Sequence, residues 1–256
     1  MTTVPARTSS AVFVDRSIRL TLRDVETMIT AIVLPVLLML LFTYVFGGQL
    51  AGGQRAYIDY VTPGIILLCA GFGAASTALA VSRDMTSGTV NRLRTMPIHA
   101  PTVLVGHVVA SLVRNLLATA VVIAVGVAIG YRPSAGPVGW LAALALIAGW
   151  ILAVTTLFAL IGLFSGSPEA ANGYGFIFLF LPYVSSAFVA VATMPSWLRP
   201  FAGNQPITAV IEPIRTLLGA TTPDAGATAT AVAWIVGITA VSGTLVAVTF
   251  RRRLRR

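Results

Sequence analysis

Lysine is absent from this sequence, and all seventeen basic residues are arginine. Coding bias accounts for that preference better than selection for function does, yet the absence has a chemical consequence. A Walker A loop needs a lysine to reach the nucleotide phosphates, so this chain cannot contain that loop. If ATP drives the protein, a separate polypeptide must bind it.

Charged residues are scarce in general. They make up 10% of the 256 residues, and 57% are hydrophobic, whereas a soluble domain carries about 25% charged residues. Such a chain cannot hide its apolar surface from water and belongs in a bilayer. The formal net charge of +9 would indicate nucleic-acid binding in a soluble protein, but membrane proteins concentrate arginine on their cytoplasmic side. We therefore expect membrane lipid, and no nucleic acid, as a partner.

Groups that could carry chemistry are also few. The one cysteine, Cys69, lies in an apolar run, and the two histidines, His99 and His107, are eight residues apart. These residues make neither a disulfide nor a metal site. The apolar runs contain no paired carboxylates and no serine–histidine constellation, so we expect no catalytic residue, metal or cofactor. Their central parts carry no ionisable residue, which disfavours a proton-coupled or ion-coupled carrier.

Six apolar segments are long enough to cross a membrane, because a spanning helix needs about 20 residues at about 1.5 Å each. Pro35 and Pro182 fall inside the first and fifth segments and should kink them. The small-residue pairs in "GVAIG" (126–130) and "GLFSG" (162–166) favour close helix packing inside the protein. We expect the six spans near residues 27–46, 61–81, 107–130, 138–163, 171–191 and 228–250.

Arginine counts in the flanking segments set the orientation. The N-terminus, the loop after the second span with the start of the third, and the C-terminal "RRRLRR" together hold thirteen arginines, and the alternate loops hold four. Both termini and the loop after the second span are therefore expected on the cytoplasmic side. The first apolar run is too long for a signal-peptide core, so no cleaved signal is expected.

An amphipathic segment precedes the first span, in residues 1–26. Apolar residues at helical spacing predict a helix that lies in the membrane interface with its arginines toward the headgroups. The alternative is a frayed start of the first span. The apolar stripe comprises Val14, Ile18, Leu22, Val25 and Ile29.

A second amphipathic stripe lies in the outer segment, residues 192–227. It predicts a helix of about three turns that lies at the outer interface or dips into the membrane and returns. Thr208, Glu212 and Arg215 lie to its side, and Trp197 is suited to anchor the segment at the interface. The stripe comprises Ile207, Val210, Ile211, Ile214, Leu217 and Leu218.

The loop between the second and third spans, residues 82–106, contains "RDMTSGTVNRLRTMP". Asp84 and Ser87 are candidate N-caps, and Pro97 would stop a helix of about two turns. A helix this short is unstable alone and needs a partner surface. The alternative, a solvated loop whose arginines only set the topology, is equally compatible with the residues. A narrow apolar stripe with an arginine on either side follows from the spacing of Val90, Leu93, Met96, Arg92 and Arg94.

At this loop the sequence resembles the ABC-2 type permeases, and among them the daunorubicin-resistance permease group. Three further stretches match the group in order, so the resemblance covers nearly the whole chain: "LPVLLMLLFTYVFGG", "YIDYVTPGI", and the run from "LPYVSSAF" to "NQPITAVIEPIRTLLG". Two departures are mild, since many relatives carry Glu where Asp84 stands and the group often has Arg where His107 stands. The loop pattern itself falls on Asp84, Gly88, Arg92, Arg94 and Pro97, and continues through "VLVGHVVASLVRN".

The resemblance implies one ABC-2 transmembrane domain over residues 1–256, an all-α polytopic fold in the bacterial plasma (inner) membrane. It implies six transmembrane helices with both termini cytoplasmic and an N-terminal interfacial helix. It also implies a cytoplasmic coupling helix between the second and third spans, and a short extracellular or re-entrant helix between the fifth and sixth. The coupling helix would act through Asp84, Gly88, Val90, Arg92, Leu93, Arg94, Met96 and Pro97.

The same resemblance implies a permease subunit of an ATP-driven exporter, with no ATPase activity of its own. Two permeases, identical or paralogous, would join two copies of an ABC ATP-binding subunit, which binds ATP and magnesium. The cargo is expected to be an amphiphilic drug-like compound or a lipid. Two rival functions stay open, a proton-coupled secondary multidrug carrier and a non-transport membrane scaffold.

The cargo would pass between two permease copies, along the first, second and fifth spans. Aromatic side chains there offer broad, adaptable contact to apolar ligands, although each ring could instead contact lipid or pack internally. The candidate cavity residues are Tyr44, Phe46, Phe72, Phe176, Phe180, Tyr183 and Phe188.

Overall fold

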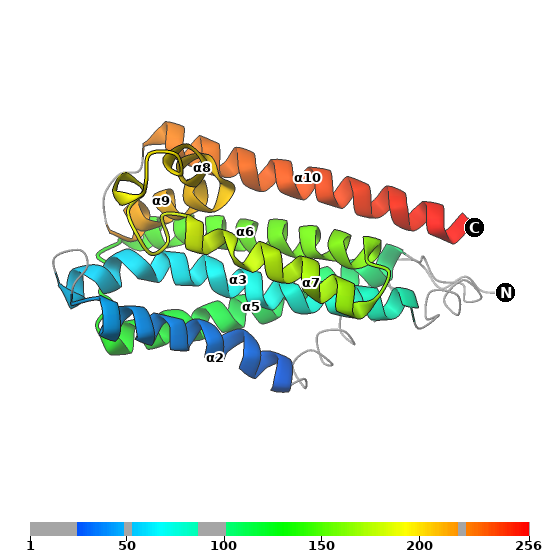
Figure 1. The fold of residues 1–256 in the computed structure, drawn as a ribbon, viewed down its shortest axis with the longest axis horizontal. Helices are drawn as coiled ribbons and strands as arrows, with labels where there is room; N and C mark the ends of the chain where they lie inside the picture. Colours follow the sequence, from blue (N-terminus) through cyan, green and yellow to red (C-terminus); the bar gives the residue numbers. More distant parts are fainter. Residues whose placement is uncertain (1–24, 49–52, 87–100, 220–223, 256) are drawn as a thin grey trace.

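The computed structural model describes residues 25–48, 53–86, 101–219 and 224–255, and every regular element in these ranges is a helix. The longer helices lie side by side along the long axis of the molecule (Figure 1). The predicted all-α, polytopic membrane fold is therefore confirmed for the described residues. Four helices are long and apolar enough to cross a membrane: α3 (Gln54–Thr86), α5 (Pro101–Ile129), α6 (Pro137–Phe164) and α10 (Ala225–Arg255).

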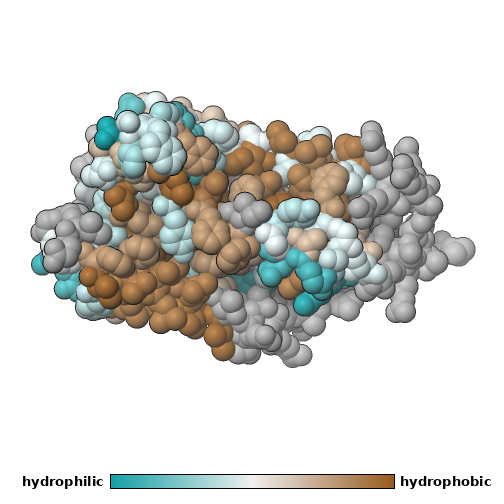
Figure 2. Space-filling model, in the orientation of Figure 1, coloured by the Kyte–Doolittle hydropathy of each residue, from teal (hydrophilic) through white to brown (hydrophobic). Residues whose placement is uncertain are grey.

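The centre of the bundle is α3. It contacts α5 and α6 and also two shorter helices, α2 (Val25–Leu41) and α7 (Pro168–Leu179). Figure 2 shows hydrophobic side chains over α2, where Leu37 and Leu41 are exposed. In water each exposed Å² of apolar surface would cost about 25 cal/mol, and lipid removes that cost. The surface of α2 therefore suits a bilayer.

Two helices extend further than expected into the loop that joins them. The second span was expected to end at 81, but α3 continues to Thr86, and α5 already begins at Pro101. Asp84 therefore lies in the last turn of α3 and does not cap a separate helix. A hydrogen bond between Asp84 and His107 of α5 joins the two extended ends. Residues 87–100 of the expected loop of 82–106 lie outside the described residues, as does the interfacial helix predicted before residue 25.

The fifth predicted span, 171–191, is not one helix. After α7 ends at Leu179, the chain forms a 3₁₀ turn, η2 (Leu181–Val184), and then runs irregularly to a second one, η3 (Val191–Thr193). Pro182 was expected to kink a continuous helix, and here the helix ends just before it. Because proline has no N–H and its ring clashes with the preceding turn, it either kinks or ends an α-helix. By contrast, α2 passes through Pro35 and ends in a π-helical turn, η1 (Phe42–Phe46).

The outer segment folds back over the end of the bundle opposite to the C-terminus (Figure 1). It contains α8 (Arg199–Asn204) and α9 (Pro206–Leu218), and α9 confirms the predicted amphipathic helix. Its apolar stripe is buried against α3, α6 and α10, so this face contacts protein. Thr208, which was expected beside the apolar stripe, is buried as well, and its hydroxyl donates to Ala202 O.

Candidate functional site

A row of aromatic rings runs from the end of α2 to the broken fifth segment. Phe42 stacks on Phe188 with ring centroids 4.3 Å apart, and Phe188 stacks on Tyr183 at 5.2 Å. Phe180 continues the row at 6.2 Å from Tyr183, and Phe176 lies 5.0 Å from Phe180. The row therefore joins two elements that are far apart in sequence through contacts typical of aromatic pairs.

Five of the seven candidate cavity residues belong to this row. Phe46 joins the row, with its ring centroid 5.4 Å from that of Phe42. Phe42 was not among the candidates from the sequence. Tyr44 and Phe72 lie elsewhere, because Tyr44 is exposed on η1 and Phe72 is half-buried against the core. Phe42 could have been found in the sequence, since it stands one helical turn before Phe46.

The irregular backbone after η2 is held by side chains of α3. Tyr60 Oη donates to Ser186 O at 2.9 Å, and Tyr57 Oη donates to Phe188 O at 3.1 Å. Ser186 and Phe188 are buried. Buried backbone polar groups need hydrogen-bond partners, and these two tyrosines supply them for Ser186 O and Phe188 O.

Helix α9 supplies the remaining partners of the same segment. The Arg215 guanidinium donates to Ser186 O at 2.8 Å and to Tyr60 O at 3.1 Å, and it lies 3.8 Å from the centre of the Tyr60 ring. Thr208 Oγ1 accepts a hydrogen bond from Ser186 N. Gln205, at the start of α9, donates to Val184 O. The sequence placed Arg215 at the side of α9, but it is the residue that ties α9, α3 and the broken segment together.

Removing the contacts of Arg215 should destabilise the protein. Arg215→Met keeps a long apolar stem but removes the donors to two backbone carbonyls and the contact with the Tyr60 ring. We expect the unfolding free energy to fall by about 3 kcal/mol, measured by equilibrium unfolding in mixed micelles. Arg199→Met is the matched control, because among the described residues the Arg199 guanidinium donates to Met194 O, five residues away in the same outer segment. Equal effects of the two substitutions would contradict this role for Arg215.

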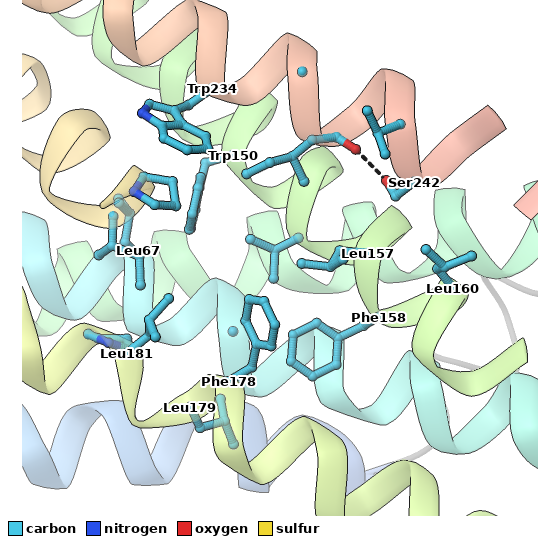
Figure 3. Close-up of a pocket in the computed structure, with 18 residues that line it drawn as sticks. Leu67, Trp150, Leu157, Phe158, Leu160, Phe178, Leu179, Leu181, Trp234 and Ser242 are labelled. Atoms are coloured by element: carbon cyan, nitrogen blue, oxygen red, sulfur yellow. Dashed lines mark hydrogen bonds between the residues drawn. The ribbon is translucent and has the colours of Figure 1, made fainter. Parts of the chain in front are cut away.

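A separate apolar cavity of about 540 Å³ lies between α6, α7 and α10. Figure 3 shows Phe158, Phe178 and Trp234 around it. Apart from Ser242, whose hydroxyl donates to Ile238 O at 2.6 Å, its lining side chains are aliphatic or aromatic. None of the seven candidate aromatic residues lines it, so the aromatic row and this cavity are distinct features.

A buried polar cluster joins α3 and α5. Arg114 is 7% exposed and donates to Gly73 O at 3.0 Å and to Ser76 Oγ at 2.6 Å. Ser111 accepts from Asn115 Nδ2, and a Cβ atom on Gly73 would lie 1.5 Å from Asn115 Oδ1. The sequence placed Arg114 just inside the third span, and its side chain lies between α3 and α5. The signal was present, because Arg114 and Asn115 interrupt an apolar run and buried charges in membranes need polar neighbours.

The ends of α3 and α5 next to the loop are joined by a hydrogen bond between His107 and Asp84. His107 Nε2 lies 2.7 Å from Asp84 Oδ2, and both side chains are partly exposed. The other seven predicted coupling residues, between Gly88 and Pro97, lie outside the described residues.

In the described residues, no group of three or more His, Cys, Asp or Glu side chains could hold a metal ion.

Comparison with known proteins adds to this geometry. A family model described as ABC-2 type transporter matches residues 9–218. The chain is 28% identical over 195 residues to the daunorubicin resistance ABC transporter permease protein DrrB1 of Streptomyces coeruleorubidus, covering 76% of this chain and 69% of that protein. It is 26% identical over 194 residues to the probable doxorubicin resistance ABC transporter permease protein DrrC of Mycobacterium tuberculosis, covering 75% and 70%. The doxorubicin resistance ABC transporter permease protein DrrB of the same organism is 26% identical over 201 residues, covering 74% and 65%. These matches confirm the resemblance predicted from the sequence.

Proposed function

The chain belongs to the ABC-2 type transporter family, and from that membership we propose that it is the permease of an exporter of amphiphilic drug-like compounds or lipids. The observation that carries the proposal is a family match over residues 9–218, which includes the loop, the aromatic row and α9. Its relatives are named for resistance to daunorubicin and doxorubicin. Permeases of this family work with an ATP-binding subunit, which supplies the nucleotide site that a chain without lysine cannot form.

In the proposed topology the chain crosses the bacterial plasma membrane six times, with both termini in the cytoplasm. The four long helices account for four crossings. A fifth is formed by α2 with η1, of 17 and 5 residues, because about 20 residues span the hydrocarbon core. The sixth crossing is formed by α7 and η2, which lie in the predicted fifth span. The arginine-rich N-terminus, 87–100 loop and C-terminus then share the cytoplasmic side.

The proposed coupling element is the segment from Asp84 to Pro97. It begins in the last turn of α3 and precedes the first turns of α5, and the contact between Asp84 and His107 joins these two helices. A movement of the loop would therefore reach both helices. The buried Arg114 cluster joins the same two helices further along, so α3 and α5 would move as one unit.

The proposed substrate surface is the aromatic row, facing a second permease copy. Phe176, Phe180, Tyr183 and Phe46 are each more than a third exposed, so a ligand or a second chain could contact them. Rings in a continuous row offer large apolar area with few rotatable bonds. Two permeases, identical or paralogous, and two ATP-binding subunits would enclose this surface.

The experiment that tests the proposal uses inverted membrane vesicles with both the permease and its ATP-binding subunit. We expect ATP-dependent accumulation of daunorubicin that persists when the proton gradient is collapsed. Accumulation that needs the gradient and no ATP-binding subunit would instead show a secondary carrier. Absence of both transport and substrate-stimulated ATP hydrolysis in the reconstituted complex would favour a scaffold.

A further inference from the structure

A polar pocket with two arginines lies where η1, the beginning of α3 and the turn after α5 meet. Its volume is about 390 Å³. It is separate from the aromatic row, from the apolar cavity and from the loop between α3 and α5. Its lining residues are Thr43, Gln54, Arg55, Ile58, Ile129, Gly130 and Arg132.

Arg132 is exposed, and one nitrogen of its guanidinium is held by backbone carbonyls. Its Nη1 donates to Val127 O at 2.5 Å and to Tyr131 O at 3.0 Å, and its backbone N–H donates to Asp59 Oδ1 at 3.3 Å. Among the described residues, Nε and Nη2 have no hydrogen-bond partner. A guanidinium fixed by one nitrogen keeps a fork of donors suited to an anion.

Arg55 lines the same pocket as Arg132, from the first turn of the 33-residue helix α3. It is exposed and makes no ion pair with any described residue. The start of a long helix carries partial positive charge and unpaired N–H groups, so it favours an anion as well.

The wall of the pocket contains a further polar group without a partner. Thr43 is 1% exposed, and its hydroxyl has no hydrogen-bond partner in the part of the chain that the structure describes. A buried hydroxyl left unpaired costs free energy. A ligand oxygen in the pocket would be a suitable partner for it.

We propose that this pocket binds the phosphate of an anionic glycerophospholipid. Basic pockets between transmembrane helices are suited to such headgroups. The surface beside the pocket selects a lipid over a free anion, because Leu41, Val45 and Val127 are exposed on the two helical segments that border it. The phosphate would lie between Arg55 and Arg132, and the acyl chains would follow the apolar side chains of α2 and α5.

The test measures lipid binding to the purified full chain in detergent, by native mass spectrometry with added phosphatidylglycerol or phosphatidylcholine. We expect tighter binding of phosphatidylglycerol, and a loss of about 30-fold in its affinity for the double variant Arg55→Gln, Arg132→Gln. Arg199→Gln is the control, because Arg199 lies in the outer segment outside the pocket. It should bind phosphatidylglycerol as the unsubstituted chain does.

Two results would overturn the inference. Equal affinity of the double variant and the unsubstituted chain for phosphatidylglycerol would exclude the two arginines as its ligands. Displacement of phosphatidylglycerol by millimolar inorganic phosphate would show a site for free anions that does not select lipid. Because the measurement needs neither ATP nor the partner subunit, its failure leaves the exporter proposal standing.

Discussion

Reversing two charges in the 87–100 loop, by Arg92→Glu together with Arg94→Glu, should abolish co-purification of the permease with its ATP-binding subunit. ATP-driven export should fall to background in the same vesicles. The two arginines flank the apolar stripe of Val90, Leu93 and Met96, which is the proposed docking surface. Like charges brought together at an interface cost several kcal/mol, so the affinity should fall by more than about 100-fold.

In the proposed topology the loop arginines also orient the chain in the membrane, so the control must separate docking from insertion. Arg92→Lys with Arg94→Lys keeps both charges and should insert normally, with weaker but measurable docking because lysine lacks the planar fork. Arg199→Glu reverses one charge in the outer segment and should leave association unchanged. Protease accessibility of the C-terminus would report whether each variant is inserted in the same orientation. If the double glutamate variant still retained the ATP-binding subunit, the coupling assignment would be wrong.

Much of the fold could be predicted because helices are governed by local spacing. The apolar runs near 61–81, 107–130, 138–163 and 228–250 each lie within or close to the bounds of a long helix, and the stripe that predicted α9 is the face that it buries. Helix ends were less predictable. The extension of α3 to Thr86 brings Asp84 to His107, a residue 23 positions away, and no local pattern contains that contact.

The broken fifth segment could not be predicted, because Pro182 allows either a kink or an end of the helix. A break in a buried segment requires partners for the backbone groups that it frees. Here those partners are Tyr57, Tyr60 and Arg215, which come from other elements. Five of the aromatic residues in the row were candidates from the sequence. It could not show that Phe42 stacks on Phe188, since that contact joins segments separated by most of the chain.

Helices α3 and α6 pack closely at Gly162, the first glycine of the small-residue pair in "GLFSG". A Cβ atom on Gly162 would lie 2.3 Å from Ala78 O and 2.9 Å from Ala78 Cα. Both atoms belong to the backbone, so no side chain can turn away to make room. Gly162→Ala should therefore push α6 away from α3 and lower the unfolding free energy by about 3 kcal/mol, measured by loss of helical circular dichroism during unfolding in mixed micelles.

Two other glycines provide matched controls for this substitution. Gly166, the other member of the pair, and Gly243, in the middle of α10, would each place a Cβ atom in open space. Gly243→Ala should raise the unfolding free energy by up to about 1 kcal/mol, because alanine is the better helix former, and Gly166→Ala should change little. The opposite signs expected for Gly162 and Gly243 separate steric contact from helix propensity. If all three variants were equally stable, α3 and α6 would not pack as closely as the structure places them. In that case the small-residue pair would have no role inside the protein.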